Sequence, residues 1–131
     1  MAHELINPDG LRVPLSYTHV VVASGTRIVF VAGQVAEDAD DNLVGPGDLA
    51  VQARQAFANV DRCLAAAGAS PDQVTMLRIY VVGHRPEFLP LISDARISVF
   101  GSYRPADTIV GVERLAEDGR LIEIEATAVL D

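Results

Sequence analysis

Two stretches of the sequence carry carboxylates that are candidates for ligand binding or catalysis. Asp107 stands in "RPADTIVGV", at the junction between a short loop and an apolar strand predicted to begin at about Thr108. Glu123 and Glu125 stand in "LIEIEATAVL", where the alternation of side chains along a strand places both on one face. A carboxylate can bind a cation or a hydrogen-bond donor, or act as a general base that activates water.

A tyrosine and a histidine form a second candidate group. Tyr17 and His19 are two residues apart, so a strand would project both from the same side, where they could line one cleft with Glu123. The other histidines, His3 and His84, are distant in sequence and show no metal-ligand spacing. We therefore predict no metal site.

Composition excludes several classes of function. The net charge is −8, and all ten basic residues are scattered arginines, so the chain is a poor candidate for nucleic-acid binding, ribonuclease activity or a polybasic membrane surface. Without lysine there is no Schiff-base amine and no Walker-type phosphate loop. The single cysteine, Cys63, lies on the apolar stripe of a predicted helix, and we expect a buried core thiol rather than a nucleophile.

No signal peptide or membrane span is predicted. "MAHELINPDG" lacks a basic region followed by an apolar one, and the apolar run after His19 is interrupted by Ser24-Gly25-Thr26-Arg27. We expect a cytoplasmic protein.

The elements that would position these residues give an α+β pattern over one domain, residues 1–131. Asp48 is a candidate N-cap, and Gly68 a candidate C-terminal stop, for the most regular helical spacing in the chain. The expected order is a hairpin of strands 16–23 and 27–35, a helix 49–67, a strand 74–82, a helix from Pro86 to about 100, a strand from 108 and a strand 121–130.

Two of these strands, "RIVFVAGQV" and "TIVGV", are apolar on both faces. Two helices can cover only one face of the expected five- or six-stranded sheet, and strands of this kind are normally covered on both faces. The second cover has to be another copy of the chain or another protein. The face that carries Glu123 and Glu125 would then lie in or beside an interface.

Four segments together resemble the reactive-intermediate deaminase family, also called YjgF or L-PSP proteins. They are "SYTHVV", "VAGQV", "QARQAFANVDRCLAAAGAS" and "IEIEATAV", and they span nearly the whole chain in the family's order. The resemblance implies a chorismate-mutase-like homotrimer that binds small molecules in clefts between subunits. It also implies hydrolysis of enamines and imines, such as 2-aminoacrylate, to 2-oxo acids and ammonia without a cofactor.

The resemblance also implies site residues. The family tyrosine falls on Tyr17, the signature glycine on Gly33 and the water-positioning glutamate on Glu123. The family motif "PAR[ST]" falls on Pro105-Ala106-Asp107-Thr108, so Asp107 stands where the deaminases use an arginine to bind the substrate carboxylate.

Two further positions depart from the family pattern. Ile109 replaces a small polar residue or cysteine that contributes to the ligand site, and Ala32 replaces the signature serine. The favoured interpretation is a small-molecule cleft protein, a divergent hydrolase that does not act on simple 2-imino acids. One alternative is a true imine deaminase that uses a relocated arginine, with Arg104, Arg78 and Arg12 as candidates. Another is a regulatory or interaction protein with no catalysis.

Overall fold

The computed structural model describes residues 2–131, and its centre is a four-stranded mixed sheet. The strand order is β3-β6-β4-β5, in which β6 runs antiparallel to both of its neighbours and β4 runs parallel to β5. The strands are β3 (Arg27–Gln34), β4 (Val74–Val82), β5 (Ala106–Val112) and β6 (Ile122–Leu130).

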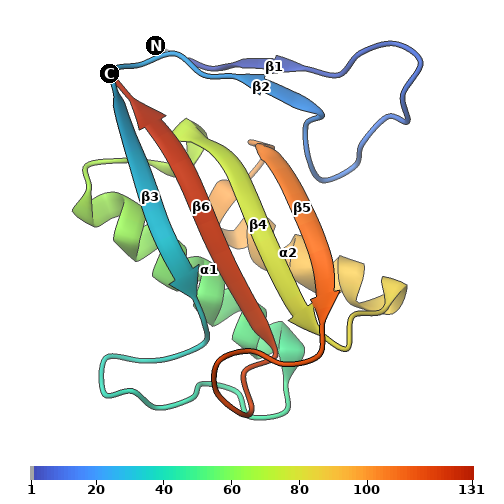
Figure 1. Cartoon of the computed structure of the whole chain (residues 1–131), viewed down its shortest axis with the longest axis vertical. Helices are drawn as coiled ribbons and strands as arrows, with labels where there is room; N and C mark the ends of the chain where they lie inside the picture. Colours follow the sequence, from blue (N-terminus) through green and yellow to red (C-terminus); the bar gives the residue numbers. More distant parts are fainter. Residues whose placement is uncertain (1) are drawn as a thin grey trace.

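Both long helices, α1 (Leu49–Ala66) and α2 (Leu89–Phe100), cover the same face of this sheet. Figure 1 views the sheet from the other face, with the helices behind the strands. The predicted α+β architecture with two helices on one face is confirmed.

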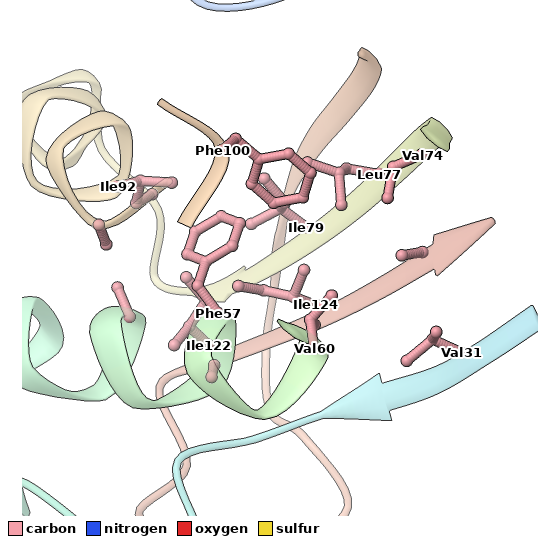
Figure 2. Packing of buried hydrophobic residues seen from close by; sticks show 14 of the residues in the cluster. Val31, Phe57, Val60, Val74, Leu77, Ile79, Ile92, Phe100, Ile122 and Ile124 are labelled. Carbon is pink, nitrogen blue, oxygen red and sulfur yellow. The ribbon is translucent and has the colours of Figure 1, made fainter. Parts of the chain in front are cut away.

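The core between the helices and the sheet follows from side-chain alternation. Along β6 every second residue is buried, beginning with Ile122 and Ile124, while Glu123 and Glu125 point to the uncovered face. Phe57 of α1 and Phe100 of α2 meet edge to face with ring centroids 6.1 Å apart (Figure 2). Burial of each such side chain contributes about 1.5–3 kcal/mol, which makes this layer the main source of stability.

The ends of α1 are fixed by the predicted signals. The Asp48 carboxylate accepts a hydrogen bond of 3.1 Å from the backbone N–H of Val51. Gly68, two residues beyond the helix, has a φ of +76°, a conformation that favours glycine.

The second helix begins later than predicted. Residues Pro86–Phe88 form a short 3-10 turn (η2), and α2 itself begins at Leu89. Pro90 is tolerated because the first turn of a helix leaves its backbone N–H groups without helical partners.

The predicted hairpin of residues 16–23 with 27–35 is wrong. Residues 20–22 form β2 (Val20–Val22), which pairs with the unpredicted β1 (Glu4–Ile6) in a separate two-stranded sheet. Figure 1 shows this ribbon beside one end of the main sheet, near both chain termini. Gly25 passes so close to β6 that an added Cβ would lie 2.3 Å from the carbonyl oxygen of Leu130. After Gly25 the chain continues into β3, which pairs with β6 and not with β2. The main sheet therefore has four strands rather than five or six.

Candidate functional site

A pocket of about 540 Å³ opens on the helix-covered side of the sheet. Its walls come from α2, from β5 and from the loop of residues 12–17. Four residues singled out in the sequence line it: Arg12, Tyr17, Asp107 and Ile109. The pocket is the natural candidate site, because it combines apolar walls with a small number of polar groups.

Asp107 reaches this pocket because it belongs to a strand and not, as predicted, to the loop before one. Within β5 it lies opposite Leu77 of β4, which is fully buried against the helices. Neighbouring strands share their pleat, so Asp107 and Ile109 face α2. Thr108 alternates to the uncovered face and is exposed, so the chain does not bring it to the pocket.

The pocket holds a charged residue that the sequence analysis missed. Arg96 of α2 lines the pocket, and the residue is only 3% exposed. Its Nη1 donates to the carbonyl oxygen of Tyr103 at 3.2 Å, whereas its buried Nε has no hydrogen-bond partner within residues 2–131. The available signal was spacing: Ile92, Arg96 and Phe100 recur every four residues on one helix face, so an arginine stands on an apolar stripe.

The two charged groups shift each other's ionisation. Burial raises the pKa of Asp107 to about 6, and the nearby Arg96 guanidinium opposes that rise. Burial lowers the pKa of Arg96, with the Asp107 carboxylate opposing the effect. Asp107 is therefore mostly ionised at neutral pH but within reach of protonation in mild acid.

Tyr17 and His19 lie in the loop that precedes β2, not on a strand as predicted. Their rings meet edge to face at 5.2 Å, and His19 Nε2 lies 2.7 Å from the carbonyl oxygen of Arg12. The backbone N–H of His19 donates to Oδ1 of Asn7 at 2.9 Å. His19 thus stabilises the loop, and within one chain Tyr17 lines the Asp107 pocket and not the recess of Glu123.

Glu123 and Gly33 lie together on the uncovered face of the sheet. A β-bulge between Val31 and Gln34 brings Gly33 so close that an added Cβ would lie 2.2 Å from Oε2 of Glu123. Both residues line a small recess of about 100 Å³. Two other carboxylates line this recess, Glu37 and Glu117, and both pair with Arg120, whereas no ion pair of Glu123 is seen within residues 2–131.

Asp107 and Glu123 do not share a cleft within one chain. Asp107 faces the helices and Glu123 faces away from them, so the sheet separates the two. Only a contact between two copies of the chain could bring the two sites together.

The remaining candidates fall into different places. Arg12 lines the Asp107 pocket, Arg78 projects from the uncovered face and Arg104 is exposed outside the pocket. Cys63 is half-buried and not fully buried as predicted, because it borders a second groove between α1 and the segment after β3. Within residues 2–131, no group of three His, Cys, Asp or Glu side chains is arranged to hold a metal ion, and no helix is long and apolar enough to cross a membrane.

Comparison with known proteins agrees with this architecture. The family model described as Endoribonuclease L-PSP matches residues 11–130. The solved structure of the Rid family protein YyfB from Yersinia pestis is 40% identical, covers 99% of this chain and 100% of that chain, and has a TM-score of 0.93.

Two relatives carry names that state an activity. The 3-aminoacrylate deaminase RutC of Acinetobacter baylyi is 31% identical over 98% of both chains. The 2-iminobutanoate/2-iminopropanoate deaminase of Dermatophagoides farinae is 30% identical over 88% of this chain and 86% of its own length. On the family match, the relatives and the fold together, the chain belongs to the Rid/YjgF/L-PSP family.

Proposed function

We propose that this protein is a divergent Rid-like hydrolase that binds a small molecule in the Asp107 pocket and does not act on simple 2-imino acids. The observation that carries the proposal is the position of Asp107, inside the pocket and on the same face as Ile109. A carboxylate at this point repels the carboxylate of an imino or oxo acid. A charge-assisted hydrogen bond to such a ligand contributes about 1.5–3 kcal/mol elsewhere, and here it is replaced by repulsion.

The hydrolytic group of the proposed site is Glu123. Hydrolysis of a C=N bond adds the oxygen of water to carbon and a proton to nitrogen, after which the adduct loses an amine or ammonia to leave a carbonyl. A carboxylate that accepts the proton of the attacking water fits Glu123, whose side chain lies against Gly33 in an open recess.

The two halves of the site would meet in a homotrimer. Asp107 and Tyr17 would come from one copy, and Glu123 and Gly33 from the next. The uncovered face supports this arrangement, because Ile28 and Phe30 are 60% and 78% exposed there and residues 2–131 of the same chain leave them uncovered.

A second candidate function is imine deamination with a relocated arginine. Two relatives are named as deaminases, and Arg12 and Arg96 both line the pocket. Arg12 is exposed at the pocket mouth, where solvent screens its charge, so it is the weaker replacement.

Calorimetric titration with 2-oxobutyrate separates these functions. Wild type is expected to bind it weakly or not at all, and Asp107→Arg to bind it about ten- to a hundred-fold more tightly. Asp94→Arg makes the same charge change on the exposed side of α2 and is the matched control. Turnover of 2-iminobutanoate is measured on the same three proteins.

The outcomes divide clearly. Tight binding of 2-oxobutyrate and rapid turnover by wild type would reject the proposal in favour of the deaminase. An Asp107→Arg protein that is folded and assembled like wild type but gains no affinity would show that the ligand does not contact residue 107.

A further inference from the structure

The pocket contains one buried donor, on Arg96, and one half-buried acceptor, on Asp107, for which the described residues provide no hydrogen-bond partner. Arg96 uses Nη1 to bind Tyr103, while its Nε, although buried, has no partner within the described chain. Asp107 lines the same pocket. Other carboxylates, such as Asp48, Glu125 and Glu37, accept hydrogen bonds from residues 2–131, but Asp107 does not. Buried polar groups normally have partners, so an open pair lining a cavity points to a ligand.

A structural ion pair does not account for this arrangement. The direct ion pairs of the described chain involve Arg120 with Glu37 and Glu117, and Arg96 is not in contact with Asp107 in the same way. Each group still influences the pKa of the other, so the pocket presents a positive and a negative group that interact across it. A ligand with a single charge would gain from one partner and lose to the other.

The walls of the pocket disfavour charged ligands further. Ile79, Leu89, Ile92 and Ile109 line it with aliphatic carbon. Transfer of an ion into such surroundings costs much more than transfer of a neutral polar group whose hydrogen bonds are satisfied. A neutral group that offers both a donor and an acceptor matches the pocket best.

We propose that Arg96 and Asp107 together recognise a neutral group in which a carbonyl oxygen adjoins an N–H, such as a carboxamide, a lactam or a ureido group. The carbonyl oxygen accepts from the guanidinium of Arg96, and the ligand N–H donates to the carboxylate of Asp107. An aliphatic part of the ligand lies on Ile92 and Ile109. This inference rests on the proposed function, because it names the ligand class of the same pocket.

The test uses three probes of equal chain length: pentanamide, pentanoate and pentylamine. Their affinities for the wild-type protein are measured by NMR titration well above the pKa of Asp107. Pentanamide is expected to bind about ten-fold or more tightly than either charged probe, because only the amide satisfies both groups.

Two variants assign the contacts. Arg96→Met removes the donor and Asp107→Leu removes the acceptor with little change in side-chain size, and each is expected to weaken pentanamide binding about ten- to a hundred-fold. Arg54→Met, which changes an exposed arginine on α1, is the control. Should Arg96→Met unfold because Tyr103 loses its partner, Asp107→Leu still tests the contact from the other side.

The proposal is overturned if pentanoate binds wild type as tightly as pentanamide, or if neither variant weakens the amide. A different result is expected if the pocket does not bind a ligand at all. In that case no probe binds wild type, and 2-oxobutyrate does not bind Asp107→Arg. If 2-oxobutyrate does bind Asp107→Arg while pentanamide fails to bind wild type, the pocket stands and the neutral ligand class is wrong.

Discussion

At the scale of single residues, Asp107 makes the stability of the protein depend on pH. Its pKa is about 6 in the folded chain because burial penalises the charge, against about 3.9 in an unfolded chain. Between these values the folded state holds more protons than the unfolded state, so the contribution of Asp107 to stability falls as pH rises through the window. Above about pH 6 the ionised, half-buried carboxylate is destabilising.

Asp107→Asn is therefore expected to raise the free energy of unfolding at neutral pH. The gain is about 1–3 kcal/mol above pH 6 and vanishes below about pH 4, where the wild-type carboxyl is protonated in both states. Urea unfolding of both proteins across this range measures it, with Asp94→Asn on the exposed side of α2 as control. A constant difference at every pH would contradict the assigned pKa.

Gly33 and Glu123 are expected to be energetically coupled. Gly33→Ala places a methyl group where Oε2 of Glu123 now lies, so the carboxylate must move. We expect a destabilisation of about 1 kcal/mol in the wild-type background and much less in Glu123→Ala, a coupling within the range known for contacting residues. A double-mutant cycle by thermal unfolding measures this, and additive effects would argue against the contact.

The sequence predicted part of the site and missed part of it. Tyr17, Asp107 and Ile109 line one pocket, but nothing in the spacing of β5 indicated that Asp107 lies inside the strand rather than before it. The face of the sheet to which Asp107 points is defined only if Asp107 belongs to the strand, and β5 begins at Ala106, two residues before the predicted Thr108. Arg96 was missed because an arginine on an amphipathic helix is usually exposed, and the local signal, its place on the stripe of Ile92 and Phe100, was not used.

At the scale of elements, one buried polar side chain of α1 bonds to two other segments of the chain. Gln52 is fully buried; its Nε2 donates to the carbonyl oxygens of Gly45 and Gly119, and its Oε1 accepts from the N–H of Leu121. The three bonds are 2.9–3.1 Å long. They connect α1 to the loop before it and to the segment that leads into β6.

Gln52→Leu would leave these part-buried backbone groups without their side-chain partner. Each costs about 1–3 kcal/mol, so a loss of about 3 kcal/mol or more is expected in urea unfolding. Gln55→Leu removes only the 2.9 Å bond to Asn59 and should cost less than about 1 kcal/mol. Equal costs for the two variants would refute the bridging role of Gln52.

The positions of helices and strands could be predicted better than the pairing of the strands. The helical stripe of α1 and the alternation of β6 are local patterns, and both were found with the right bounds to within a few residues. The pairing of β2 was not, because the short β1 gives no periodic signal and Gly25 turns the chain away from the expected hairpin.

At the scale of the whole molecule, the uncovered face of the sheet predicts assembly. Phe30 of β3 is 78% exposed there and Val110 of β5 is 40% exposed, although both lie in regular strands. Light scattering on wild type is expected to give three times the chain mass of 14.0 kDa.

Phe30→Glu should break this assembly, because a charge in an apolar interface is costly to desolvate. The expected result is a species of one chain mass that keeps its circular dichroism spectrum. Ile97→Glu alters an equally apolar but helix-borne exposed position and should remain assembled. Retention of the oligomer by Phe30→Glu would place the interface elsewhere.

The contact between Thr18 and the residues before β5 bears on how this chain can tolerate insertions and deletions. The backbone N–H of Thr18 donates to the carbonyl oxygen of Pro105 at 3.1 Å, and its hydroxyl donates to that of Arg104. Tyr17 precedes Thr18 and Asp107 follows Pro105 by two residues, so these two hydrogen bonds hold the two pocket residues close to each other. An extra residue between Tyr103 and Asp107 would displace both pocket walls together, whereas one in the exposed turn at Glu117-Asp118 would leave them in place. Among proteins of this fold, insertions and deletions are therefore expected in the turn that corresponds to Glu117-Asp118 and not in the segment that corresponds to residues 103–107.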